Sequence, residues 1–264
     1  MYSEITYEVR GAVARVTLNR PEKRNPLGPV TIGELLHALD AAKADRAVRV
    51  IVLTGAGKVF SAGGDLTSFP SGGATPLQSG ESASTRPGSF VDLNLALTRV
   101  AKPTIAMVNG HALAGGLGLV VACDVAIAAD DAQFGTPEIN VGLWPMMIMA
   151  TIFRNVPRKR GLEFIMTGDK ISAAEAAQIG LITRAVPRDQ LEAEVQALAD
   201  KLAQKSPTVM QMGLDAFYAT QDMELAPALD YLQQQLIAVL STPDAIEGLM
   251  AFREKRAPVW PSLK

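Results

Sequence analysis

The chain has 264 residues, one cysteine and a formal net charge of −2, and 48% of its residues are hydrophobic. A chain of this size can bury the core of one α/β domain with a helical appendage. The charge leaves no basic footprint for nucleic acid, and one cysteine excludes an internal disulfide framework. No apolar run reaches the roughly 20 residues that cross a bilayer, and the first residues show no secretion signal. We therefore expect a cytoplasmic protein that is not a membrane protein.

The first third of the chain predicts strands around one helix. Residues 7–9 and 13–18 predict a hairpin around Gly11. Apolar residues at helical spacing follow, and Thr31-Ile32-Gly33-Glu34 has the spacing of a capping box. Residues 48–54 form a β-rich run. Residues 67–89 are rich in Ser, Gly and Pro, which predicts a mobile loop within one domain.

Strand signals continue to about the middle of the chain and then give way to helices. Residues 90–100 predict a helix, 104–108 a strand, 115–123 a buried helix and 125–129 another strand. After residue 157 the pattern is helical, with an apolar stripe at Leu191, Val195, Leu198 and Leu202 and further helices over 223–240 and 244–252. This distribution favours an α/β core over residues 1–200, followed by a helical region over 201–264.

Two glycine-rich turns carry the strongest functional signal. The first covers residues 60–66 (FSAGGDL) after the apolar run 50–53, and the second covers 109–118 (NGHALAGGLG) after the strand 104–108. Each can expose backbone N–H groups at the end of a strand, and two such groups aimed at one point make an oxyanion hole. Glycine permits a close approach of the ligand that a side chain would block.

These turns belong to an ordered series of segments that resembles the crotonase, or enoyl-CoA hydratase/isomerase, superfamily nearly end to end. The other segments are 18–25 (LNRPEKRN), 52–57 (VLTGAG), 132–138 (AQFGTPE), 167–168 (TG) with 171–176 (ISAAEA), and 252–258 (FREKRAP). The resemblance implies a spiral of ββα units with a C-terminal helical region that assembles trimers or dimers of trimers. It implies an acyl-CoA thioester as substrate and no metal or separate cofactor, because CoA arrives with the substrate.

The resemblance also assigns roles to individual residues. The N–H groups of Gly64 and Gly115 would hold the thioester carbonyl and stabilise its enolate. Glu138 matches one of the two catalytic glutamates of hydratases and would transfer a proton, although a loop glutamate that caps a turn has the same pattern. Trp144 could line the acyl pocket or only pack in the core. The residues implied to bind substrate are Lys23, Arg24, Ala62, Asp65, Leu66, Gly116, Pro137 and Trp144.

Gly118 departs from the family pattern. It stands where two-glutamate hydratases carry their other catalytic glutamate, so the pair that activates water is broken. The glycine could also serve only to let two helices approach. One remaining base suits double-bond isomerisation, in which a proton is removed and returned elsewhere. Three functions stay open: a family enzyme acting through an enolate, with hydratase as the expected type; a Δ3,Δ2-enoyl-CoA isomerase; and an acyl-CoA-binding protein with little turnover.

Overall fold

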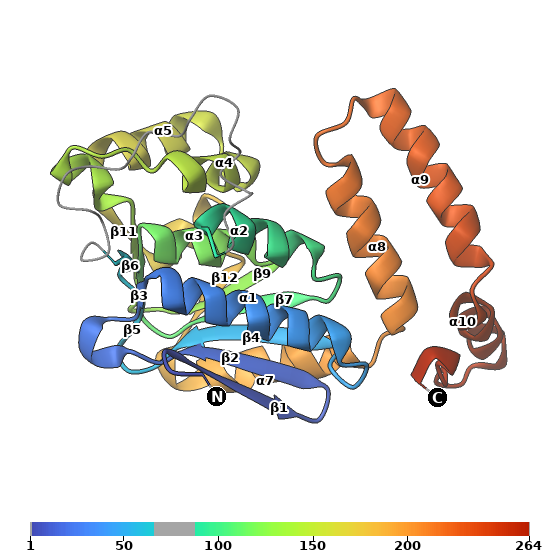
Figure 1. Cartoon of the computed structure of the whole chain (residues 1–264). Coiled ribbons are helices and arrows are strands. Elements are labelled where there is room, and N and C mark those ends of the chain that lie inside the picture. Colours follow the sequence, from blue (N-terminus) through green and yellow to red (C-terminus); the bar gives the residue numbers. More distant parts are fainter. Residues whose placement is uncertain (1, 66–87, 264) are drawn as a thin grey trace.

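The computed structural model describes residues 2–65 and 88–263 (Figure 1). Its frame is a six-stranded sheet with the spatial order β1 (Ile5–Arg10), β2 (Val13–Leu18), β4 (Val50–Gly55), β7 (Thr104–Val108), β9 (Val125–Ala129) and β12 (Arg184–Val186). β1 and β2 form the antiparallel hairpin predicted around Gly11, and every other neighbouring pair in this sheet is parallel.

Three successive ββα units build the core. In each unit the first strand lies in the six-stranded sheet and the second joins a four-stranded sheet, whose order is β11 (Lys170–Ser172), β10 (Gln133–Gly135), β8 (His111–Leu113) and β5 (Val59–Ser61). The helices of the units are α2 (Phe90–Arg99), α3 (Gly115–Ala122) and α4 (Met146–Asn155). The sequence predicted the first strand of each unit but not the three-residue second strands.

Both faces of the large sheet are buried, which explains why its central strands are apolar throughout. Alternate residues of β4 point to opposite sides: Ile51 and Leu53 join the cluster under α1 (Pro29–Ala44), α2 and α3, whereas Val50 and Val52 join the cluster over α7 (Leu191–Ala203). Figure 1 shows these helices on the two faces. The predicted stripe of α7 is confirmed at its buried residues Leu191 and Val195.

The C-terminal helices lie beside the core (Figure 1). They are α8 (Pro207–Thr220), α9 (Leu225–Leu240) and α10 (Pro243–Glu254). Elsewhere the chain forms the helices α5 (Arg158–Thr167) and α6 (Ala173–Gln178) and the two-stranded pair of β3 (Pro26–Leu27) and β6 (Gly63–Gly64). It also forms the short 3₁₀ turns η1 (Pro21–Lys23), η4 (Pro137–Val141), η5 (Arg188–Gln190) and η6 (Pro261–Leu263). The predicted boundary at residue 200 falls inside α7, which packs on the sheet. No helix in the described part of the chain is long and apolar enough to cross a membrane.

The predicted mobile loop over residues 67–89 lies outside the described residues, apart from its last two. Of these, Ser89 caps α2. Its hydroxyl accepts a hydrogen bond from the N–H of Asp92 at 3.1 Å, and the Asp92 carboxylate accepts one from the N–H of Ser89 at 3.1 Å. This capping box fixes the start of α2 at Phe90.

The capping box predicted at Thr31 and Glu34 is wrong. α1 begins earlier, with Gly28 as its N-cap and Pro29 as its first residue, a position that proline's fixed φ suits. The Thr31 hydroxyl instead donates to the carboxylate of Glu4, and the carbonyl of Pro26 lies 3.2 Å from the same hydroxyl. The two side chains therefore lie inside the first two turns of the helix and are free to bond to other segments.

Glu34 ties α1 to the beginning of β1. Its carboxylate accepts hydrogen bonds from the N–H groups of Ser3 (2.7 Å), Glu4 (2.8 Å) and Ile5 (3.1 Å), and from the Ser3 hydroxyl at 2.7 Å. Burial of the carboxyl group opposes its ionisation, but these hydrogen bonds outweigh burial and hold the pKa of Glu34 below its usual range. The ionised carboxylate is therefore the form that the fold stabilises.

Glu34→Gln should lower the free energy of unfolding by about 1 kcal/mol at neutral pH, because an amide offers one acceptor oxygen and no charge. A group with a lowered native pKa stabilises the fold above its unfolded pKa and loses that contribution as the pH falls through its native pKa. Urea unfolding at several pH values should therefore show a deficit that shrinks in acid. Glu175→Gln, on the exposed surface of α6, is the control. An equal deficit at every pH would contradict this role for the charge.

Candidate active site

The candidate active site lies at one edge of the four-stranded sheet. β5 pairs with β8 in parallel, and β8 pairs with β10 in parallel. The carboxyl ends of parallel neighbours meet at the same edge, so the chain leaves all three strands on one side. Gly64 follows β5, Gly115 follows β8 and Glu138 follows β10. The fold thus brings three predicted catalytic residues from three ββα units to one edge.

The two glycine turns are in direct contact. A methyl group on Gly63 would lie 2.6 Å from Cβ of Ala114 and 3.1 Å from the nitrogen of Gly115, and Gly63 has a φ of +100°. A methyl group on Gly115 would lie 3.5 Å from the nitrogen of Gly64. A side chain on Gly63 would therefore separate the turns, whereas a methyl group on Gly115 would make an ordinary van der Waals contact. Gly115 is also the first residue of α3, where an N–H has no acceptor within the helix.

A buried asparagine supports the first turn. Asn25 is 1% exposed and adopts a left-handed conformation with a φ of 53°. Its amide donates to the carbonyls of Ala56 at 3.0 Å and Val59 at 2.8 Å. The backbone carbonyl of Asn25 accepts a hydrogen bond from the Ser61 hydroxyl at 2.7 Å, and that hydroxyl accepts one from the N–H of Gly63 at 3.1 Å. Local sequence pattern gives Asn25 no role, and its one signal is that it ends the segment 18–25 (LNRPEKRN).

Glu138 lies in η4, directly after β10. Its Oε2 atom is buried and has no hydrogen-bond partner among the described residues. Desolvation raises the pKa of Glu138, and a hydrogen bond from its own N–H opposes this only in part. A carboxyl group with a raised pKa is suited to accept and return a proton near neutral pH. This oxygen, which has no hydrogen-bond partner among the described residues, could exchange a proton with a bound molecule.

Gly118 faces an apolar wall. A methyl group there would lie 2.3 Å from Cγ2 of Ile148 in α4 and 2.7 Å from Cζ of Phe90 in α2. The same Phe90 ring is 3.6 Å from the corresponding position on Gly115. The ring therefore covers one turn of α3, from Gly115 to Gly118. Sequence reasoning missed both neighbours, because helical periodicity shows that a face is buried but not which helix covers it.

The residues predicted to bind the CoA part lie on two adjoining segments. The N–H of Ala62 donates to the carbonyl of Arg24 at 2.9 Å, and the N–H of Asp65 donates to the carbonyl of Leu27 at 3.1 Å. Both Lys23 and Arg24 are exposed. Leu66 lies outside the described residues.

Gly116 and Pro137 lie near the edge, but Gly116 is packed tightly. A methyl group on Gly116 would lie 2.6 Å from Cβ of Ser61.

Trp144 is half-buried and its indole N–H donates to the sulfur of Met149 at 3.3 Å. No group of three or more His, Cys, Asp or Glu side chains that could hold a metal occurs within residues 2–65 and 88–263.

Comparisons with known proteins agree with this architecture. The family model for enoyl-CoA hydratase/isomerase matches residues 8–262. A Thermus thermophilus protein is 37% identical over 249 residues, which cover 94% of this chain and 97% of that protein. The human enoyl-CoA hydratase domain-containing protein 3 is 34% identical over 252 residues, which cover 94% of this chain and 80% of that protein.

Solved structures show the same fold. The human protein's structure matches with a TM-score of 0.89 and 32% identity, and the match covers 98% of this chain and 100% of that one. An enoyl-CoA hydratase from Mycobacterium smegmatis matches with a TM-score of 0.88 and 32% identity, covering 98% and 99% of the two chains. The predicted α/β fold, a crotonase-like spiral with a C-terminal helical region, is confirmed.

The desolvated carboxyl of Glu138 predicts a pH-dependent stability. Because its native pKa is raised, the native state keeps a proton that the unfolded chain releases, so stability falls as the pH rises between the unfolded and native pKa values. Glu138→Gln removes this dependence. The difference between its thermal midpoint and that of the unmodified protein should therefore grow as the pH rises above about 4.3, the pKa of an unperturbed glutamate, whereas Glu175→Gln should show no such gain. A constant difference across this range would contradict the desolvation.

Proposed function

The chain belongs to the enoyl-CoA hydratase/isomerase family, and we propose that it is an enzyme that transforms an acyl-CoA thioester through an enolate. The thioester carbonyl oxygen accepts hydrogen bonds from the N–H groups of Gly64 and Gly115. As negative charge develops on this oxygen, each donor contributes about 2.7–4 kcal/mol to stabilising the transition state. The observation that carries the proposal is the buried carboxyl oxygen of Glu138, which has no hydrogen-bond partner within residues 2–65 and 88–263 and lies at the sheet edge shared with both glycines.

In the proposed reaction the Glu138 carboxylate removes a proton from the acyl chain. The electron pair of the broken C–H bond moves into the thioester, and its oxygen becomes the enolate oxygen. The protonated Glu138 then returns the proton to a carbon of the conjugated system. Burial favours the protonated carboxyl once it forms, which supports this shuttle.

We propose double-bond isomerisation as the narrower activity, on the evidence of Gly118. Hydration needs water held and activated beside the acyl chain, and two-glutamate hydratases use a second carboxylate there. In this chain the corresponding position carries no carboxylate and is covered by Phe90 and Ile148. Proton transfer between two carbons needs only one base, so the apolar wall is compatible with isomerisation. The alternatives are hydration by one carboxylate, which would yield a hydroxyacyl-CoA product, and binding without turnover, which would yield no product.

Glu138→Gln should lower turnover by at least two orders of magnitude, because a general acid/base contributes about 10²–10⁴-fold. Affinity for the CoA thioester should change little, since the amide nearly preserves size. The assay uses 2-enoyl- and 3-enoyl-CoA series with products identified by NMR and mass spectrometry, beside binding measured on the same preparations. Unchanged turnover would remove Glu138 from the mechanism, and joint loss of binding and folding would show a structural role.

Gly118→Glu should not create an efficient hydratase. Its first side-chain carbon would collide with Ile148 and Phe90, and productive geometry must be held within roughly 0.5 Å. We expect a lower thermal midpoint and little hydration of crotonyl-CoA. Gly118→Ala separates the causes: overpacking alone typically costs about 1–3 kcal/mol. A stable glutamate variant that hydrates crotonyl-CoA at ordinary enzyme rates would show that the apolar wall does not block this chemistry.

We propose that the chain assembles as a homotrimer or a dimer of trimers through its C-terminal helices. The proposal rests on the family resemblance and on large apolar side chains that a monomer seldom leaves together on its surface. The exposed ones on α9 and α10 are Leu225, Leu229, Leu232, Leu236, Ile237, Leu240, Ile246, Leu249, Met250 and Phe252.

Light scattering at micromolar concentration should report a mass at least three times the 28.0 kDa of one chain. Leu236→Glu should shift the mass downward, because an unpaired carboxylate in an apolar interface opposes association. The exposed Leu263, outside these helices, offers Leu263→Glu as the matched control. A single 28 kDa species of the unmodified protein would refute the assembly.

A further inference from the structure

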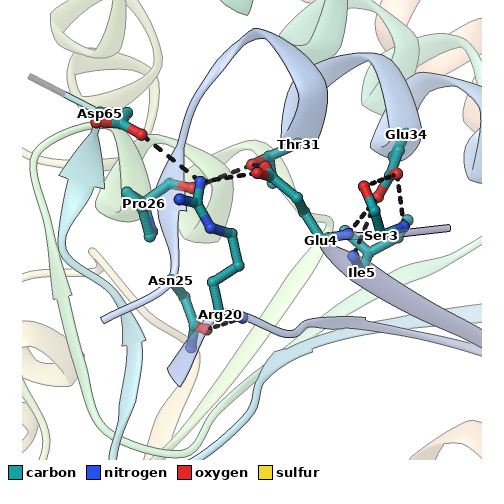
Figure 2. Close-up of polar contacts among 9 residues, drawn as sticks. All are labelled: Ser3, Glu4, Ile5, Arg20, Asn25, Pro26, Thr31, Glu34 and Asp65. Carbon is teal, nitrogen blue, oxygen red and sulfur yellow. Dashed lines mark hydrogen bonds and ion pairs between the residues drawn. The ribbon is translucent and has the colours of Figure 1, made fainter. Parts of the chain in front are cut away.

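A nearly buried ion cluster lies behind the first glycine turn. The Arg20 guanidinium lies 2.9 Å from the carboxylate of Glu4 and 3.6 Å from that of Asp65. The three side chains are only 16–18% exposed. Figure 2 shows the guanidinium between the two carboxylates. The cluster therefore connects the residue before β1 and the segment after β2 with the residue that directly follows Gly64.

Asp65 is fixed on two further sides. Its N–H donates to the carbonyl of Leu27 at 3.1 Å, and its Cβ lies 3.5 Å from the position that a methyl group on Gly28 would occupy. Asp65 thus packs against the N-cap of α1. The preceding strand, β6, consists of two glycines, which have the freest backbone of all residues. The orientation of the Gly63–Gly64 peptide consequently depends on the pairing of β6 with β3 and on how firmly Asp65 is held.

The other end of the cluster is anchored to α1. Glu4 accepts a hydrogen bond from the Thr31 hydroxyl, and its N–H donates to Glu34 at 2.8 Å. Arg20 is also held through its backbone, whose N–H donates to the Asn25 side chain at 2.9 Å. These contacts, most of them drawn in Figure 2, restrain the guanidinium from the side opposite Asp65. A planar guanidinium with several fixed donors can bridge two carboxylates, which a lysine ammonium does with less directional restraint.

We propose that Arg20 is a positioning residue for the oxyanion hole: by holding Asp65, it fixes the direction of the Gly64 N–H. The inference rests on the proposed function of Gly64 and Gly115 as the two donors to a thioester carbonyl. Arg20 itself touches no reacting atom. Its effect passes from Asp65 through Gly64 to the Gly63–Gly64 peptide, which carries the Gly64 N–H, and a displacement of about 1 Å there can cost about 10²-fold in rate.

Three variants test the restraint. Arg20→Met removes the charge and the donors, Arg20→Lys keeps the charge, and Asp65→Asn removes the carboxylate charge with little change of shape. We expect Arg20→Met to lower kcat by about 10–100-fold, with thioester affinity within about threefold of the unmodified protein. Arg20→Lys should recover part of the loss. Because both side chains act through one contact, Arg20→Met with Asp65→Asn should be no slower than the slower single variant.

A spectroscopic readout tests the same contact without turnover. The probe is the straight-chain saturated acyl-CoA, from acetyl- to decanoyl-CoA, that binds most tightly, labelled with ¹³C at the thioester carbonyl. Two aimed N–H donors polarise that carbonyl, so its infrared band should move to lower frequency on binding. In Arg20→Met the movement should be smaller and the bound band broader. The matched control is Arg184→Met, because Arg184 pairs with Glu194 at 3.2 Å on the α7 side of the sheet.

The outcomes distinguish a failure of the proposed oxyanion hole from a failure of the positioning role of Arg20. If the unmodified protein binds no acyl-CoA, or shows no carbonyl shift, the proposed oxyanion hole fails and this inference fails with it. If the unmodified protein shows the shift and Arg20→Met retains it with unchanged kcat, only the positioning role is overturned. If Arg20→Met does not fold, Arg20→Lys and Asp65→Asn test the inference in its place. A full carbonyl shift and an unchanged kcat in both variants would overturn the inference. A reduced carbonyl shift in Asp65→Asn would support it.

Discussion

The parallel alignment of three short strands is the constraint on which the candidate site depends. β5, β8 and β10 contribute three residues each, and they carry Gly64, Gly115 and Glu138 to one edge. Each strand is the second of its ββα unit, so the spiral repeats one geometry and places a different group at each repeat. Such short strands have few ladder hydrogen bonds of their own. The buried side chain of Asn25 adds to the restraint of β5, because its amide donates to the carbonyls of Val59 and Phe60.

The same edge carries features that cost stability. Ala114, which precedes the second donor, has a φ of 48° with a ψ of −129°, a combination unfavourable for a residue with a side chain. Glu138 has a buried oxygen without a partner among the described residues. Neither feature helps the protein to fold, and both lie where the proposed chemistry needs a fixed N–H and a carboxyl ready to take a proton. Their coincidence at one edge is what a site kept for function would show.

Local pattern in the sequence accounted for the long elements and for the family. The run 125–129 is the strand β9 with the same bounds, and the helix expected at 115 begins there. Shorter features escaped, because a three-residue strand is too brief to show a period. The capping box at Thr31 and Glu34 failed for a different reason: Pro29 starts the helix earlier, and both side chains bond to Glu4, which is distant in sequence. Long-range contacts, such as those of Phe90 and Ile148 with Gly118, have no local signature.

Exchange of the α-protons of a saturated acyl-CoA in deuterated water tests the central claim most directly, because it needs only an enolate and not the natural substrate. NMR would follow loss of the α-proton signal with the unmodified protein, with Glu138→Gln and with Glu175→Gln. Enolate formation at this edge predicts exchange with the unmodified protein and the control, and exchange at least 100-fold slower with Glu138→Gln. Exchange no faster than in buffer, for every acyl chain that binds, or equal exchange in all three proteins, would contradict it.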